Sequence, residues 1–157
     1  MFIKKTGDII EGPEVHLFVE ALAPAAKHKN YVPAYIFGIR KNVSCERVGR
    51  ISLRIGSNML IDRYAGNIGY TIDRAHRGHG YAGKACKLLV PLAKAHDFAL
   101  LYITCNPDNQ ASRRTIEKLG AELLGVENVP RDTEMYKRGD RIKLRYVWRI
   151  NEPQVAE

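Results

Sequence analysis

The chain has 157 residues and a formal net charge of +8, from 25 lysines and arginines against 17 aspartates and glutamates. This length suits a single domain, residues 1–157, whose hydrophobic core needs no disulfide or metal to hold it. Its apolar runs are far shorter than a membrane span and its first residues lack the apolar stretch of a secretory signal, which argues against a membrane protein and predicts a cytoplasmic one.

Cysteine content and charge distribution narrow the possible partners. The three cysteines, Cys45, Cys86 and Cys105, are an odd number and form no CxxC pair. That pattern argues against a disulfide framework and a zinc site, so we expect free thiols and no metal. The positive charge is dispersed and forms no basic run, which disfavours a nucleic-acid partner. A ligand that carries phosphate groups would account for part of the excess.

The first half of the chain has the alternation typical of β-strands. In residues 47–55, Ile51, Leu53 and Ile55 alternate with polar side chains, as expected of a strand with one buried face. Less regular patterns predict further strands at residues 14–20, 33–40 and 66–73, with a turn at residues 41–44.

The period changes to that of a helix after residue 80. Apolar side chains recur at helical spacing from Ala82 to Ala93. Pro91 is expected to kink this helix, because it has no amide hydrogen for the carbonyl oxygen of Lys87. The apolar run at residues 98–105 then predicts a strand that is covered on both faces.

A second helix is predicted at residues 109–119. Asp108 or Asn109 is its N-cap, and Gly120 ends it. Strands follow at residues 122–126 and 142–150, the latter with a regular alternation of apolar and polar side chains. Strands and helices in this order predict a mixed sheet with helices packed on it.

A glycine-rich segment separates the strand at residues 66–73 from the first helix. Residues 78–85 read G-H-G-Y-A-G-K-A. Amides at a helix N-terminus have no intrahelical acceptor and carry the positive end of the helix dipole, and glycines let a phosphate come close to them. The segment therefore predicts a phosphate site, although a plain helix-opening turn without a ligand fits it as well.

Two familiar phosphate-binding motifs fit this segment incompletely. A Walker A loop would use Gly78, Gly83 and Lys84, but it requires a hydroxyl for magnesium where Ala85 stands. A dinucleotide-binding loop would use Gly78, Gly80 and Gly83, but it also requires an acidic residue at the end of the next strand, and that strand ends in I-T-C.

The third motif is R-G-H-G-Y-A at residues 77–82. It resembles the Q/R-x-x-G-x-G/A signature of the GNAT superfamily of N-acetyltransferases. Residues 109–120, N-Q-A-S-R-R-T-I-E-K-L-G, resemble a second element of that family, and the likeness extends over residues 66–125. The R-Y-V-W ending at residues 145–148 is similar to an uncharacterised bacterial branch. The resemblance implies an α+β fold: a mixed, mostly antiparallel sheet of about six or seven strands, with a central splayed parallel pair and helices packed on the sheet.

The resemblance also implies an acyl-CoA, acetyl-CoA, as the co-substrate. Its pyrophosphate would lie on the amides of the glycine loop, and its pantetheine arm would lie between the splayed strands at residues 66–73 and 98–105. Asn109 fits a helix cap equally well. The residues that would hold the coenzyme are Tyr70, Ile72, Arg77, Gly78, His79, Gly80, Tyr81, Ala82, Asn109 and Ser112.

The catalytic groups of the family do not transfer to this chain. Many members have a tyrosine acid where this chain has Ile116, and some have a carboxylate where it has A-G-N at residues 65–67. An acid is the more dispensable partner, because a thiol with a pKa of about 8.5 is only about 2 kcal/mol from its anion at pH 7. Ser112 is the first candidate to protonate the leaving thiolate and Tyr146 the second, although Tyr146 lies on an apolar face and also fits a core residue.

The reaction implied is transfer of an acetyl group to a primary amine by direct attack on the thioester. The alternatives are a non-catalytic acyl-CoA-binding module and a basic nucleic-acid-binding protein. The acceptor site is expected between the N-terminal strands, the connection at residues 21–32 and the segment at residues 127–140, which fits either a substrate lid or an exposed loop. A monomer and a homodimer both remain open.

Overall fold

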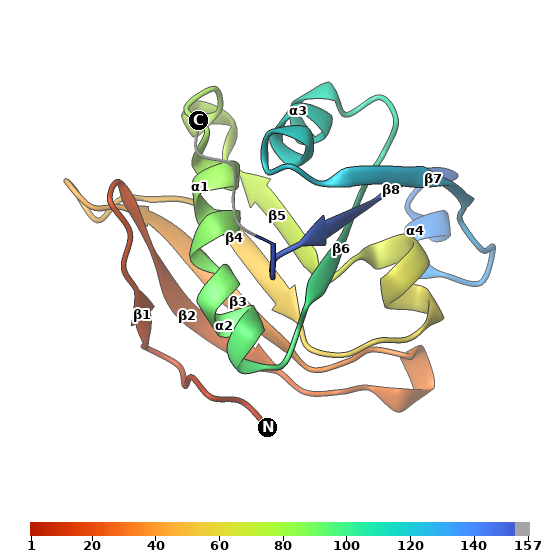
Figure 1. Cartoon of the computed structure of the whole chain (residues 1–157), viewed down its shortest axis with the longest axis horizontal. Helices are drawn as coiled ribbons and strands as arrows, with labels where there is room; N and C mark the ends of the chain where they lie inside the picture. The colour runs from red at the N-terminus through yellow and green to blue at the C-terminus, as the bar shows by residue number, and fades with distance from the viewer. Residues whose placement is uncertain (153–157) are drawn as a thin grey trace.

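The computed structural model describes residues 1–152, whose strands form one sheet. The strand order is β1-β2-β3-β4-β5-β6-β8-β7, and every neighbouring pair is antiparallel except β5 and β6 (Figure 1). This confirms the expected mixed sheet with one central parallel pair. The strands are β1 (Ile9–Ile10), β2 (Val15–Ala23), β3 (Ala34–Lys41), β4 (Arg47–Arg54), β5 (Ile68–Ile72), β6 (Leu100–Cys105), β7 (Glu122–Asn128) and β8 (Ile142–Arg149).

The sheet has one strand more than the upper number expected. The extra strand is β1, which has two residues and pairs with β2 at Phe18 and Leu17. Two residues are too few for an alternation of apolar and polar side chains, so the sequence carries no signal for this strand.

Alternation in β4 has the predicted effect: Ile51 and Leu53 are fully buried, whereas Arg50 is exposed. The last strand, β8, departs from its pattern. Val147 and Lys143 are also buried there, although both lie on the face predicted to be polar. The reason is tertiary, because a turn of π-helix, η2 (Leu60–Ala65), packs on β6 and β8, and Lys143 pairs with Asp140.

The first helix is divided as Pro91 predicts. α1 (Tyr81–Leu88) and α2 (Val90–Ala95) are separated at Leu89, and Pro91 lies in the first turn of α2, where a missing amide hydrogen costs least. Helix α1 buries three small side chains against β2, β4 and β5: Ala82, Ala85 and Cys86.

The second helix, α3 (Gln110–Lys118), begins and ends by local rules. The Asn109 side chain accepts a hydrogen bond from the amide of Ser112 at 3.1 Å, which makes Asn109 the N-cap. Gly120, with φ of +87°, follows the helix end. Ile116 is the residue of α3 that is fully buried.

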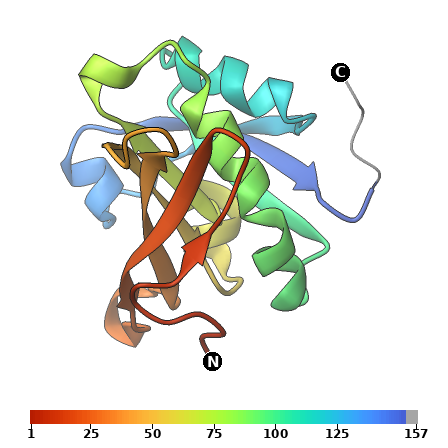
Figure 2. The ribbon, with the colours of Figure 1, turned by 90° about the vertical axis from the view of Figure 1, so that its left-hand side faces the viewer.

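Several short elements carry no sequence signal. They are η1 (Lys27–Lys29), η3 (Arg74–His76) and a single turn, α4 (Glu134–Lys137), inside the segment predicted as a loop. In the rotated view, α1 and α2 lie on one side of the sheet and α4 on the other (Figure 2). Among residues 1–152, the helices are all too short to cross a membrane.

Candidate functional site

Strands β5 and β6 part soon after they begin to run side by side. They pair where Ile68 is opposite Ile103, and just before this point the amide of Asn67 donates to the carbonyl oxygen of Tyr102 at 2.6 Å. Strand β5 goes on pairing with β4 as far as Ile72. In the described chain, β5 has no residue paired with β6 beyond Ile68. Backbone groups of β5 on that side are therefore available to a ligand, as the splayed pair predicts.

The buried side chain of Asn67 fixes the point at which the strands part. Asn67 is 2% exposed, and its Nδ2 donates to the carbonyl oxygens of Arg54 and Gly56, both at 3.2 Å. Its Oδ1 accepts from the amide of Tyr102 at 2.9 Å. A Cβ atom on Gly66 would lie 2.9 Å from the carbonyl oxygen of Tyr102, so glycine is what permits β6 to come this close. These two residues thus have a structural role.

The glycine loop presents a row of free amides at the start of α1. Gly78 and Gly80 have φ of +86° and +72°, which lie in the left-handed region, and a Cβ atom on either would meet no other atom within 4 Å. Backbone conformation rather than space therefore requires glycine here. In the described part of the chain, the first amide of the segment with an acceptor is that of Lys84, which donates to the carbonyl oxygen of Gly80 at 3.1 Å. The preceding amides are free to bind an anion.

Side chains around the loop anchor it. The guanidinium of Arg77 donates through Nε to the carbonyl oxygen of Ile72 at 3.0 Å, across the end of β5. The ammonium of Lys84 donates to the carbonyl oxygen of His79 at 3.1 Å and pairs with Glu14. The rings of His79 and Tyr81 lie with their centroids 5.4 Å apart.

A polar cluster lies where the parted strands meet α3. The hydroxyls of Tyr70 and Ser112 are 2.7 Å apart and share a hydrogen bond. Burial raises the pKa of Tyr70 far above its ordinary value, so this hydroxyl stays protonated at neutral pH. Burial also raises the pKa of the neighbouring Cys105 thiol, which is 5% exposed. The cluster can therefore donate hydrogen bonds but offers no resident anion.

A cavity of about 750 Å³ opens from this cluster. Tyr70, Asn109 and Ser112 line it, whereas the other residues expected to hold the coenzyme, Ile72 and residues 77–82, lie outside its walls. The segments expected to form the acceptor site also line it, with Tyr31 from the first and Glu134 from the second.

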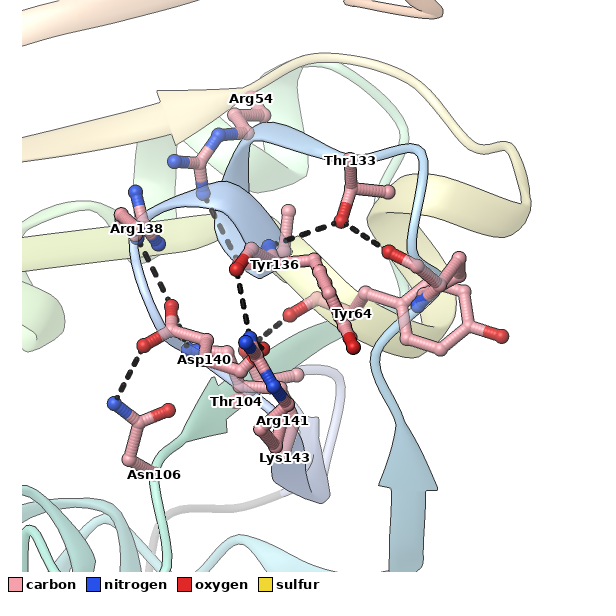
Figure 3. A network of polar contacts seen from close by, with 12 residues as sticks. Arg54, Tyr64, Thr104, Asn106, Thr133, Tyr136, Arg138, Asp140, Arg141 and Lys143 are labelled. Atoms are coloured by element: carbon pink, nitrogen blue, oxygen red, sulfur yellow. Dashed lines mark hydrogen bonds and ion pairs between the residues drawn. The ribbon is translucent and has the colours of Figure 1, made fainter.

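The segment at residues 127–140 is a folded part of the cavity wall. Met135 of α4 is 8% exposed, and the hydroxyl of Thr133 donates to the carbonyl oxygen of Pro130 at 2.7 Å. The guanidinium of Arg141 lies 3.6 Å from the centre of the Tyr136 ring (Figure 3). This packing holds the segment in place against the sheet.

Asp140 is the centre of a polar network that includes residues of the cavity wall (Figure 3). Its carboxylate accepts hydrogen bonds from Arg138 Nε at 2.9 Å, Asn106 Nδ2 at 3.0 Å and Lys143 Nζ at 3.2 Å. Partial burial alone would raise the pKa of Asp140, but these three donors outweigh it and lower the pKa below its ordinary value. Two cations of the cavity wall, Arg138 and Lys143, are thereby held in position.

Tyr146 belongs to the core and not to the cavity wall. Its side chain is 1% exposed in the core, its hydroxyl donates to Glu117 Oε1 at 3.3 Å, and burial raises its pKa. It does not line the cavity. The structure therefore brings Ser112 to the cavity wall together with Tyr70, but it does not bring Tyr146 there.

Comparison with known proteins identifies relatives. A family model described as an acetyltransferase (GNAT) domain matches residues 13–122. No curated protein matches the chain.

The fold is similar to that of solved acetyltransferases. RimL, a ribosomal L7/L12 alpha-N-protein acetyltransferase in complex with coenzyme A, has a TM-score of 0.65 at 16% identity, over 92% of this chain and 99% of that one. The acetyltransferase (GNAT family) from Bacillus anthracis has a TM-score of 0.57 at 20% identity, over 74% of this chain and 67% of that one. The ribosomal-protein-S5-alanine acetyltransferase from Vibrio fischeri has a TM-score of 0.59 at 18% identity, over 78% and 64%. At these identities the likeness shows the fold alone.

Proposed function

The chain belongs to the GNAT acetyltransferases, whose family model spans residues 13–122, and from this premise we propose that it transfers an acetyl group from acetyl-CoA to a primary amine. The observation that carries the proposal is the parting of β5 and β6 beyond Ile68, next to a loop whose amides have no acceptor among the described residues. A phosphorylated thioester with a long arm fits this pair of features: the loop suits the pyrophosphate, and the gap suits the arm.

Coenzyme binding is assigned to the loop, the strand and the start of α3. The amides of residues 78–82 bind the pyrophosphate, and Arg77 is beside them. The backbone groups of Tyr70 and the amide of Ile72 bond the pantetheine arm, while the carbonyl oxygen of Ile72 accepts from Arg77. Ser112 and the remaining donors of Asn109 reach it from α3.

The chemistry needs two proton movements. The amine nitrogen attacks the thioester carbonyl carbon, so that a C–N bond forms and the C–S bond breaks, while the amine loses a proton and the thiolate gains one. We assign delivery of the second proton to the hydroxyl of Ser112, which regains a proton from water in the same step, since it lines the cavity and is held by the neutral hydroxyl of Tyr70. Tyr146 is the weaker candidate because it lies outside the cavity wall.

Removal of the proton from the amine is the harder of the two proton movements. An amine with a pKa of about 10.4 is neutral in about 1 of 2,500 molecules at pH 7, a handicap of about 4.6 kcal/mol. Two carboxylates from the described residues line the cavity, Asp132 and Glu134, and both belong to the segment at residues 127–140. Water within the cavity would carry the proton towards them or to bulk solvent.

Calorimetry with coenzyme A tests the binding half of the proposal. Gly80→Val places a branched side chain at φ of +72°, at a cost of about 1–2 kcal/mol for the left-handed conformation, and the loop must rearrange. We expect the affinity for coenzyme A to fall about tenfold or more. Gly83→Ala is the matched control, because its Cβ atom would have only the Thr115 methyl group in range, at 3.9 Å. Absence of binding heat for the unmodified protein would contradict the proposal.

Thiol release from acetyl-CoA in the presence of amines tests the catalytic half. A transferase releases free coenzyme A only when an acceptor is supplied, in equal amount to the acetylated amine. Heat on coenzyme binding without thiol release for any amine would identify a non-catalytic acyl-CoA-binding module instead.

A further inference from the structure

Arg54, the last residue of β4, brings a positive charge into the cavity. Its guanidinium lies over the backbone of β5. A Cβ atom on Gly69 would be 3.2 Å from Nη2 and 3.4 Å from Nη1 of Arg54. Gly69 directly precedes Tyr70, whose hydroxyl meets Ser112 at the end of the cavity. Successive residues of a strand point to opposite faces of the sheet, so the guanidinium and the Tyr70 side chain lie on opposite faces of β5, and both line the cavity.

One edge of this guanidinium is occupied and the other is free. Nη1 donates to the carbonyl oxygens of Ala65 and Gly66 at 3.2 and 3.0 Å, where η2 ends. Within residues 1–152, Nε and Nη2 have no protein acceptor, and no carboxylate pairs with Arg54. Nε and Nη2 form the side-on edge through which a guanidinium binds both oxygens of a carboxylate.

The surroundings of Arg54 are positively charged and would favour binding of a negative ligand. Burial lowers the pKa of Arg54, and the positive charges of Arg138 and Arg50 lower it further. Four cations line the cavity, from Lys29, Arg54, Arg138 and Lys143, against the two carboxylates of Asp132 and Glu134. Asp140 pairs with Arg138 and Lys143, but Arg54 has no such counterion in the described chain.

We propose that the acceptor is a primary amine that also carries a carboxylate, and that Arg54 binds this carboxylate through Nε and Nη2. The inference rests on the proposed acetyl transfer and adds the substrate class. Arg54 and Ser112 line the same cavity, so a single acceptor can present its carboxylate to Arg54 and its amine to a thioester beside Ser112. A free amino acid and the acidic first residue of a peptide both satisfy this geometry.

Matched pairs of acceptors test the substrate class. Acetyl-CoA and the full-length protein are combined with glycine or glycinamide, with β-alanine or β-alaninamide, and with short peptides that begin with Asp or Asn and with Glu or Gln. Rates are compared as kcat/KM per neutral amine, because an amide lowers the pKa of its neighbouring amine. We expect the carboxylate member of at least one pair to be preferred about tenfold or more. Preference in the free amino acids or in the peptides distinguishes the two sources of the carboxylate.

Substitutions test the role of Arg54. Arg54→Gln is expected to abolish the preference, while the affinity for coenzyme A measured by calorimetry stays within about twofold. Arg50→Gln removes the same charge from the same strand but outside the cavity wall, and it should keep the preference. If Arg54→Gln does not fold, Gly69→Ala serves instead, because its methyl group displaces the guanidinium and should reduce the preference.

Three outcomes would overturn the inference. They are equal rates within every pair, a preference that survives Arg54→Gln, and acceptance of amines without a carboxylate, such as spermidine, when all carboxylate members are refused. The proposed acetyl transfer fails separately, if no amine of either kind releases thiol or if coenzyme A does not bind. In that case the inference falls with it.

Discussion

Replacement of Asn67 by alanine tests how the parted strands are held. The substitution removes three hydrogen bonds to backbone groups: two from Nδ2 to the carbonyl oxygens of Arg54 and Gly56, and one to Oδ1 from the amide of Tyr102. A hydrogen bond contributes about 1 kcal/mol net, and a buried group left without a partner costs about 1–3 kcal/mol. Since Asn67 is 2% exposed, water replaces these partners poorly. We expect the free energy of unfolding to fall by about 3 kcal/mol.

Urea denaturation at neutral pH gives the change in unfolding free energy, and hydrogen exchange adds a local readout. The amide of Tyr102 loses its acceptor in Asn67→Ala, so its exchange should accelerate more than that of Ile103, which lies one residue further along the same strand. Loss of the junction should also weaken coenzyme A binding, because the gap between β5 and β6 begins there.

Asn42→Ala is the control. Asn42 also uses its side chain twice, with Nδ2 donating to the carbonyl oxygen of Gly12 at 2.7 Å and Oδ1 3.0 Å from His16 Nδ1, but it is exposed. Water replaces these bonds, so the expected loss is within about 0.5 kcal/mol. If Asn67→Ala costs no more than Asn42→Ala, the account of the junction is wrong.

Two further predictions concern the proton donor and the polar network. Ser112→Ala should lower kcat by no more than about 30-fold at pH 7, because the free thiolate lies only about 2 kcal/mol above the thiol. A stopped-flow assay of thiol release measures the change. A loss of about 1,000-fold would assign Ser112 another role. Asp140 has a folded-state pKa below its unfolded value, so its contribution to stability is complete above pH about 4 and is lost as the pH falls through the lowered pKa. The stability difference between the unmodified protein and Asp140→Asn should therefore shrink from pH 7 to pH 3 in urea titrations, and a constant difference would contradict the assignment.

Features that obey local rules were predictable from the sequence. Pro91 marks the break between α1 and α2 because the missing amide hydrogen acts within one turn. Asn109 caps α3 through its own side chain three residues along the chain. The glycine loop was found in the same way, since the conformations of Gly78 and Gly80 are requirements of single residues.

Features that depend on distant segments were not predictable. Arg54 continues the polar side of β4, and only the placement of η2 and of the segment at residues 127–140 shows that this side forms a cavity wall. In the sequence, Asn67 stands out only because some members of the family have a carboxylate at this position. Its role requires partners from β4 and β6, which no pattern in the sequence brings together.

The proposed site of Arg54 bears on the harder of the two proton movements. In an amino acid the carboxylate stabilises the neighbouring ammonium, and this keeps the amine charged and unreactive. A guanidinium that takes both carboxylate oxygens cancels that stabilisation. Each unit by which the amine pKa falls recovers about 1.4 kcal/mol of the deprotonation handicap, which is about 4.6 kcal/mol for an amine with a pKa of about 10.4. Recognition of the acceptor and activation of its amine would then be two consequences of one buried charge, which would compensate for the carboxylate that some members of the family have where this chain has A-G-N at residues 65–67.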